Sequence, residues 1–285
     1  MRYFIFTCLL FLNLSLTFAQ KTKKEDDTDD AKLSYGMNVG FYFPSNHTAN
    51  FYNGSPNNEN KIDLILKNKY YLEPLEQQIG YIVDTVNPYT LPTNMRYTPT
   101  SNIGFYFRYQ LAKDLGVFAE INITKLTAGG VYFLNLHLPQ NYSLDPTYKE
   151  YPIWGVEKRT MINLGISRIF PLQEIMHLFI ESGINISNTK VVENKIKVEE
   201  QSFSIVNNLG SNSYIPGSTQ QTYQVIQGGI GFGVFLSSGV KFVFSENISV
   251  DPGFTFYWQQ INLGNYDGFK PAFNPFVRFT FKKLI

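Results

Sequence analysis

The sequence predicts an all-β fold: a transmembrane, antiparallel, up-and-down β-barrel of eight strands. Apolar residues alternate with small or polar residues through eight separate segments, and a period of two is typical of strands with two different faces. The segments are joined alternately by short turns and longer loops, as in barrels of bacterial outer membranes. Beyond residue 19, no window approaches the roughly 20 consecutive apolar residues of a membrane-spanning helix. The predicted membrane crossing is therefore made by strands.

Residues 226–259 carry the clearest alternation. Ile230, Phe232 and Val234 alternate with glycines, and the pattern resumes at Ile248 after a three-residue turn. Two long strands joined by so short a turn form a hairpin. One face of this hairpin is apolar and the other is rich in small residues. That arrangement suits a strand with lipid outside and a narrow polar lumen inside.

Six further segments complete the predicted barrel. They lie at about residues 33–43, 102–111, 117–136, 159–167, 178–187 and 273–282. Short turns are expected near residues 113, 173 and 246, and longer loops at about 44–100, 137–154 and 189–223. The alternative is a soluble barrel of the lipocalin type, which needs an apolar interior. Here the aromatic residues lie mostly on the face opposite the glycines and charges, which favours the membrane barrel.

The start of the chain predicts export. Residues 1–19 have a basic start, an apolar centre and small residues before a predicted cleavage after Ala19, as in a secretory signal peptide. Residues 20–32 are polar and are expected to form a periplasmic tail. Residues 33–285 then form the barrel domain in the outer membrane, with both termini in the periplasm.

Composition excludes two classes of function. The formal net charge of +1 gives no basic stripe for nucleic acid, so no nucleic-acid partner is expected. The single cysteine, Cys8, lies in the predicted signal peptide, so thiol chemistry and disulfides are not expected in the mature chain. Only 16% of residues are charged, below the roughly 25% of ordinary soluble domains. This low share is consistent with a protein whose partner is outer-membrane lipid.

The first predicted loop, residues 44–100, is the longest connection, and a helix is expected near residues 61–71. Its apolar residues would form an exposed patch unless something covers them. They are Ile62, Leu64, Ile65, Leu66, Leu72, Leu75 and Ile79. We expect the loop either to fold over the barrel mouth as a lid or to dock onto a protein partner.

Seven charged residues are predicted to face the lumen as a charge network. They are Arg108, Glu120, Arg159, Glu181, Lys241, Asp251 and Arg278. An unpaired charge in a narrow interior is costly, so acids and bases should pair. Turns centred near residues 114 and 246 predict that Arg108 pairs with Glu120 and Lys241 with Asp251. Eight strands leave an interior that side chains just fill, which predicts a plugged lumen; the alternative is an ion or proton path along the acids.

Candidate catalytic groups are few. Some small outer-membrane barrels use a histidine-assisted serine at the rim to modify lipid, and His137 is followed by Ser143 and Asp145 at a suitable height. All three fall within one loop, and nothing in the sequence fixes their geometry. No phosphate-binding glycine loop or metal-ligand cluster appears, so no cofactor or metal is expected.

We therefore predict a non-enzymatic barrel that presents its loops to a partner or acts as a subunit of a secretion, assembly or uptake complex. The alternatives are a lipid-modifying rim enzyme and a small channel.

The pattern over residues 33–285, with the terminal strand Phe279-Thr280-Phe281, resembles the small outer-membrane barrels common in Bacteroidota. These include the OmpA-like transmembrane domains and the PorT-type barrels associated with type IX secretion. The final strand resembles the signal read by the barrel-assembly machinery, although the chain ends in Lys282-Lys283-Leu284-Ile285 instead of an aromatic residue. The resemblance implies an outer-membrane protein; it does not imply attachment to the cell wall, because no peptidoglycan-binding segment follows.

Overall fold

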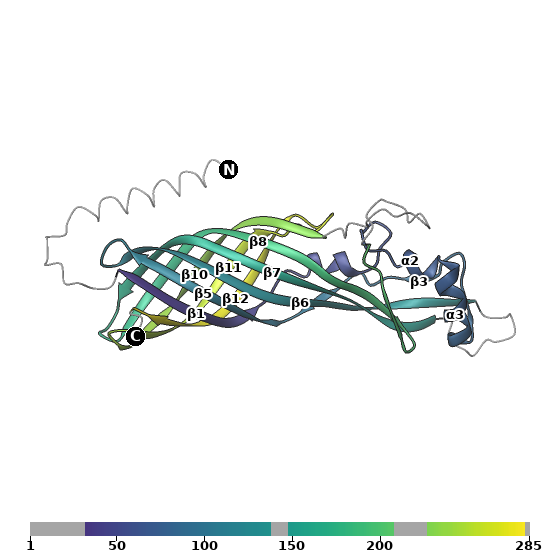
Figure 1. The fold of residues 1–285 in the computed structure, drawn as a ribbon, viewed down its shortest axis with the longest axis horizontal. Helices are drawn as coiled ribbons and strands as arrows, with labels where there is room; N and C mark the ends of the chain where they lie inside the picture. The colour runs from purple at the N-terminus through teal and green to yellow at the C-terminus, as the bar shows by residue number, and fades with distance from the viewer. Residues whose placement is uncertain (1–31, 138–147, 208–226, 283–285) are drawn as a thin grey trace, which may run out of the picture. The chain divides into compact units, whose positions relative to one another are not determined.

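Eight long antiparallel strands contain most of the residues that the structure describes (Figure 1). The computed structural model describes residues 32–137, 148–207 and 227–282, and Lys32 onward forms one unit. The predicted signal peptide and most of the polar tail lie outside the described residues. The long strands are β1 (Leu33–Tyr42), β5 (Thr100–Gln110), β6 (Leu115–His137), β7 (Tyr148–Pro171), β8 (Met176–Val198), β10 (Gly228–Ser245), β11 (Ile248–Gln260) and β12 (Phe269–Phe281). The prediction of an antiparallel all-β fold is confirmed.

The order of the long strands is β10-β11-β12-β1-β5-β6-β7-β8, and β8 also pairs with β10 along most of its length. The register carries a systematic offset. The row of paired residues that begins at Gly36 in β1 can be followed through each neighbour in turn, and it reaches β12 at Lys270. Gly36 itself pairs with Thr280 in the same strand. An offset of this kind is the stagger that barrel geometry requires.

Twelve strands, not eight, belong to the sheet. The four additional strands are short: β2 (Ile82–Val83), β3 (Tyr89–Thr90) and β4 (Arg96–Thr98) pair with β6, and β9 (Gln201–Ser204) pairs with β8. They are present because β6, β7 and β8 continue well past their neighbours. The exposed backbone of β6 takes partners from the first loop, as edge strands commonly do.

Two of the predicted loops are therefore wrong in part. Residues 148–154 belong to β7, and residues 189–198 belong to β8. In both stretches most apolar side chains point to the buried face, as those of Ile153 and Ile196 do; Tyr148 and Val192 are exposed. This is the reverse of the outward apolar pattern elsewhere, so a search for apolar outer faces ends each strand too early. The centres of the two loops, residues 138–147 and 208–226, lie outside the described residues.

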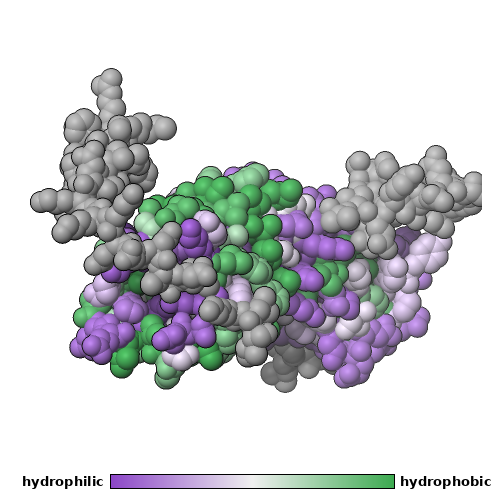
Figure 2. Space-filling view, turned by 60° about the vertical axis from the view of Figure 1, so that its left-hand side comes forward, coloured by the Kyte–Doolittle hydropathy of each residue, from purple (hydrophilic) through white to green (hydrophobic). Residues whose placement is uncertain are grey.

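Large apolar side chains cover the outer face of the long strands. These residues are exposed, while their neighbours in sequence are buried or partly buried, as alternation requires. Examples from all eight strands are Met37, Phe41, Ile103, Phe105, Ile121, Ile166, Ile184, Phe232, Leu236, Phe254 and Phe279. In Figure 2 a broad apolar area occupies part of the visible face, beside more polar regions. So much exposed apolar surface is unusual for a protein surrounded by water.

The first loop folds as a small helical segment. It contains η1 (Thr48–Tyr52), α2 (Asp63–Leu66) and α3 (Lys69–Ile79), so the single helix expected near 61–71 is replaced by two. Asn68 caps α3 by accepting a hydrogen bond from the Tyr70 backbone N–H at 3.1 Å, and α3 continues through Pro74. None of the helices in the described ranges is long and apolar enough to cross a membrane.

Most of the apolar residues of this loop are covered by the protein itself. Five of the seven are buried and join one core with the inward side chains of the extended strands: Ile62, Ile65, Leu66, Leu75 and Ile79. Leu72 is partly buried against that core, and Leu64 is exposed. The first loop, β9 and the extended ends of β6, β7 and β8 thus pack into one region of the protein, here called the platform.

Two glycines allow the inner face to close around aromatic rings. Gly165 in β7 pairs with Gly183 in β8, and Phe118 and Phe235 lie on either side of them in the same row. The two phenylalanine rings meet edge to face, with centroids 5.9 Å apart. A Cβ atom on Gly183 would lie 2.0 Å from the Leu164 carbonyl oxygen, so the close approach of these strands requires glycine.

We predict that Gly183→Ala destabilises the folded protein, because the clash is with backbone and cannot be relieved by a rotamer change. The expected loss is about 1–3 kcal/mol of unfolding free energy, typical of overpacking. Gly129→Ala is the matched control, because its added Cβ would meet nothing within 4 Å. Urea titrations of the two variants in detergent would test this; equal midpoints would contradict it.

Candidate functional site

The seven predicted charged residues all lie on the inner face of the long strands. Each comes from a different strand, and all except Lys241 are almost completely buried. Their positions follow from the alternation of the strands, which turns every second side chain inward. The structure brings six of them into one region and places Arg159 in a second cluster. Lys241 lies beside Asp251 as predicted, but Glu120 contacts a base other than the predicted one.

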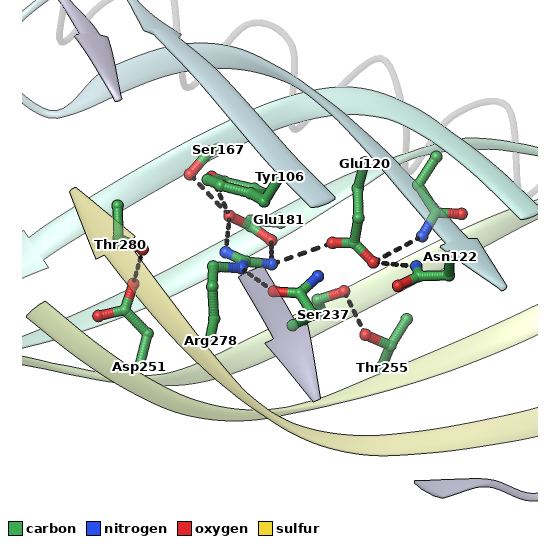
Figure 3. A network of polar contacts seen from close by, with 12 residues as sticks. Tyr106, Glu120, Asn122, Ser167, Glu181, Ser237, Asp251, Thr255, Arg278 and Thr280 are labelled. Atoms are coloured by element: carbon green, nitrogen blue, oxygen red, sulfur yellow. Dashed lines mark hydrogen bonds and ion pairs between the residues drawn. The ribbon is translucent and has the colours of Figure 1, made fainter. Parts of the chain in front are cut away.

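Arg278 is the centre of this network (Figure 3). Its guanidinium donates two parallel hydrogen bonds to Glu181, both 2.9 Å, and a third to Glu120 at 3.2 Å. Its Nε donates to the Asn38 side chain at 3.0 Å, and its Cζ lies 3.6 Å from the centre of the Tyr106 ring. The forked guanidinium suits such bidentate binding, which is stronger than a single point contact.

The two carboxylates receive further hydrogen bonds from the inner face. The Tyr106 hydroxyl donates to Glu181 at 2.7 Å, and the Ser167 hydroxyl does so at 3.2 Å. Glu120 accepts from the amides of Asn122 and Asn163. Buried carboxylates without such donors would cost several kcal/mol each, so this set of bonds makes the buried charge tolerable.

The predicted Arg108–Glu120 pair is wrong. Glu120 lies opposite Tyr106, while Arg108 lies opposite Phe118, and the base that contacts Glu120 is Arg278. The turn between β5 and β6 is centred one residue earlier than predicted, which moves every cross-strand partner by two. The Nε and Nη2 atoms of Arg108 have no hydrogen-bond partner among the described residues.

Lys241 and Asp251 form the second predicted pair. Their nearest charged atoms are 3.7 Å apart, a long ion pair. Asp251 also accepts a hydrogen bond of 2.9 Å from the Thr280 hydroxyl. This pair borders a small cavity of about 10 Å³ that is also lined by Arg108, Glu181 and Arg278. A cavity of that size holds about one water molecule, so the pocket is too small for an organic ligand.

A second charged cluster lies where the first loop meets the strands. Arg159 forms a 2.5 Å ion pair with Glu157, two residues earlier in β7, and both side chains are buried. The hydroxyl of Tyr52 in η1 donates to Glu157 at 2.5 Å, and that of Tyr97 in β4 does so at 3.2 Å. Arg159 in turn donates to the Thr48 hydroxyl at 3.3 Å.

Glu157 is a functional-site residue that sequence reasoning missed. Glu157 and Arg159 lie two residues apart on the inner face of β7, and both side chains are buried. Simple alternation does place residues 157 and 159 on one face, but residue 157 fell between the predicted loop and the predicted strand. Through these hydrogen bonds the cluster attaches the first loop to the inner face of β7, so that the loop covers the inner face at this end.

The far end of the platform carries a more exposed contact. Glu199, between β8 and β9, accepts hydrogen bonds from Lys149 at 2.8 Å and Tyr151 at 2.7 Å. These bonds lower the pKa of the Glu199 carboxyl. Because the groups are partly solvated, the contact contributes little to stability; its effect is to fix the turn against β7.

The histidine-assisted serine suggested by the sequence is not seen as a catalytic site, because only His137 of its three residues is described by the structure. His137 is exposed at the end of β6, opposite Ile82 of β2. Ser143 and Asp145 lie outside the described residues. Among residues 32–137, 148–207 and 227–282, no group of His, Cys, Asp and Glu is arranged to hold a metal ion.

Comparison with known proteins gives loose similarities. No protein-family model and no curated protein matches the chain. Among solved structures, Neisserial surface protein A is similar over 90% of this chain and 100% of its own, with 9% identity and a TM-score of 0.44. The outer membrane protein OprG from Pseudomonas aeruginosa is similar over 88% of this chain and 96% of its own, with 11% identity and a TM-score of 0.40. Ail of Yersinia pestis, solved in complex with the heparin analogue sucrose octasulfate, is similar over 88% of this chain and 97% of its own. The identity is 10% and the TM-score is 0.34. At these identities and TM-scores we base no conclusion on the likenesses.

We predict strong coupling between Arg278 and Glu181 and none between Arg108 and Glu120. Arg278→Leu leaves two buried carboxylates without their base, so it should cost about 3–5 kcal/mol. Combined with Glu181→Leu, the loss should be clearly smaller than the sum of the two single losses. A double-mutant cycle on each pair by urea unfolding is the measurement. Additive losses at Arg278 and Glu181 would mean that their contact does not matter.

Proposed function

We propose that this protein is a non-enzymatic outer-membrane β-barrel whose eight long strands close through the pairing of β8 with β10. The observation that carries the proposal is the polarity of the strands. Their outer face exposes large apolar side chains on every strand, and their inner face buries amides, hydroxyls and charges. Lipid is the surrounding that suits such an outer face, and a closed sheet leaves no unpaired backbone within it.

The packing of the interior favours a sealed barrel and not a channel. Charges on the inner face balance: Arg108, Arg278 and Lys241 accompany Glu120, Glu181 and Asp251, and Arg159 accompanies Glu157. Aromatic rings such as Phe118 and Phe235 meet across the interior. The cavity at the network measures only about 10 Å³, and so little free space beside these side chains supports a sealed interior.

The proposed orientation places the short turns and both termini in the periplasm. Leu33 at the start of β1 and Phe281 at the end of β12 lie at the same end of the sheet, since Tyr35 pairs with Phe281. The platform belongs to the opposite end and would lie outside the cell. The predicted signal peptide of residues 1–19 is consistent with this location.

The first loop combines the two roles that the sequence left open. Its residues Thr48, Tyr52 and Tyr97 contact the Arg159–Glu157 pair and cover the barrel mouth, which supports a lid. Its solvent side carries exposed apolar residues, above all Tyr70 at 89% and Val86 at 81% exposure. We propose that this side is the surface that a protein partner contacts, in a secretion, assembly or uptake complex.

The barrel proposal predicts an outer-membrane protein that is heat-modifiable and does not conduct. Membrane fractionation should recover it with the outer membrane. On a detergent gel, unboiled protein should migrate differently from boiled protein, because the closed strands resist the detergent until heated. In planar bilayers it should give no steady conductance. Recovery in the soluble fraction without detergent would refute the barrel, and a large stable pore would refute the sealed interior.

The partner proposal predicts that Tyr70→Asp with Val86→Asp removes co-purifying proteins while leaving folding intact. Both side chains are solvent-exposed, so the heat-modifiable band should be unchanged. Ile175→Asp, in a turn at the opposite end and 64% exposed, is the control and should keep the same co-purifying set. An unchanged set in the double variant would show that this surface does not bind a partner.

A further inference from the structure

Three lysines lie side by side on the outer face. Lys125 in β6 pairs directly with Lys158 in β7, and Lys158 pairs directly with Lys190 in β8. All three side chains are exposed, while the residues before and after each one are buried. Directly opposed residues on one face of a sheet have Cβ atoms about 5 Å apart, and like charges in such pairs are destabilising.

Acidic side chains of the described residues do not pair with this row. In the described ranges, no carboxylate lies within ion-pair distance of the three lysines. Glu157, next to Lys158 in sequence, points inward to Arg159. Glu193 is one row further along β8, where its carboxylate contacts Lys195 at 3.0 Å. Arg96 in β4 is exposed nearby and adds another positive charge.

The row lies where the outer face changes character. Two rows back on the same three strands, the paired residues are Ile121, Ile162 and Ile186, and the row between them and the lysines is Ile123, Thr160 and Asn188. Beyond the lysines, β6, β7 and β8 turn most of their large apolar side chains inward to the platform core, while the outer face becomes mixed, with Val131 and Val192 exposed among polar residues. The lysines therefore mark the end of the apolar belt on this side of the protein.

We propose that Lys125, Lys158 and Lys190 form a binding site for the phosphate groups of lipid headgroups. The inference rests on the proposed membrane barrel, which places the row at the outer boundary of the hydrocarbon layer. Lysines at that depth extend their ammonium groups into the headgroup region. A phosphate carries the negative charge that the row lacks, and three neighbouring ammonium groups can donate to its several oxygens. Thr160 and Asn188 offer further polar contacts just below.

The test compares stability in bilayers with and without phosphate-rich lipid. The protein, the variant K125Q/K158Q/K190Q and the control K113Q are reconstituted into phosphatidylcholine vesicles, with or without diphosphoryl lipid A. K113Q removes an exposed lysine from the turn between β5 and β6, at the opposite end of the strands. The Tm is followed by the loss of the heat-modifiable gel band. A third set, in phosphatidylcholine with added inorganic phosphate, separates lipid headgroups from free phosphate.

Lipid A should raise the Tm of the unsubstituted protein and of K113Q by several degrees, because each lysine near an anionic surface contributes favourably. The triple variant should show little of this rise. In phosphatidylcholine alone it should be as stable as the unsubstituted protein or more stable, since mutual repulsion is removed. An equal rise in the triple variant would overturn the site, and an equal rise with inorganic phosphate would overturn its assignment to lipid. Failure of the unsubstituted protein to enter bilayers would instead refute the barrel.

Discussion

Arg278 and the two glutamates that it contacts set the arrangement of the interior. A guanidinium at 2% exposure is tolerable only where carboxylates lie in bonding geometry. Glu181 and Glu120 reach it from β8 and β6, and Arg278 itself is on β12, so the contact joins strands that are not neighbours in the sheet. Tyr106, Ser167 and Asn163 then take positions that complete the hydrogen bonds of the carboxylates. A change in any of these strands that moved one partner would leave a charge buried alone, which makes the relative position of the strands highly specific.

The long strands β6, β7 and β8 pass through two different surroundings. Near the short turns that join them to their neighbours, most apolar side chains point outward, as those of Ile121 and Ile166 do, and polar ones point inward. At the opposite end, in the platform, large apolar side chains point inward, as those of Leu134, Ile153 and Ile196 do. The inversion has a structural cause, because the first loop covers the inner face there and forms an apolar core with it. In the proposed barrel, the outer face of the same strands would pass from lipid to water at this point.

The sequence predicts well whatever depends on neighbours two residues apart. The long strands, the inward position of the seven charges and the outward apolar belt all follow from alternation within one strand. It predicts poorly what depends on register, since moving a turn centre by one residue gave Glu120 the wrong base. Contacts across the interior, such as Arg278 with Glu181, join residues far apart in sequence and leave no local pattern. The start of β7 and the last part of β8 were missed because most of their apolar side chains face inward instead of outward. Glu157, which lies in the missed start of β7, was missed with them.

A charged side chain needs a partner of opposite charge on either face of the strands, but the two faces find that partner in different places. Inside, bases and acids occur in equal number, and Arg278, Arg159 and Lys241 find their acids within the chain. Outside, Lys125, Lys158 and Lys190 are aligned, and none of them forms an ion pair with an acid of the described residues, although a single carboxylate in the row would reduce the repulsion. A water-facing row of this kind would gain nothing from its alignment. Where the adjoining medium supplies anions at that depth, the alignment concentrates positive charge at the place where those anions lie. The uncompensated row is therefore better explained by what surrounds the protein than by the fold itself.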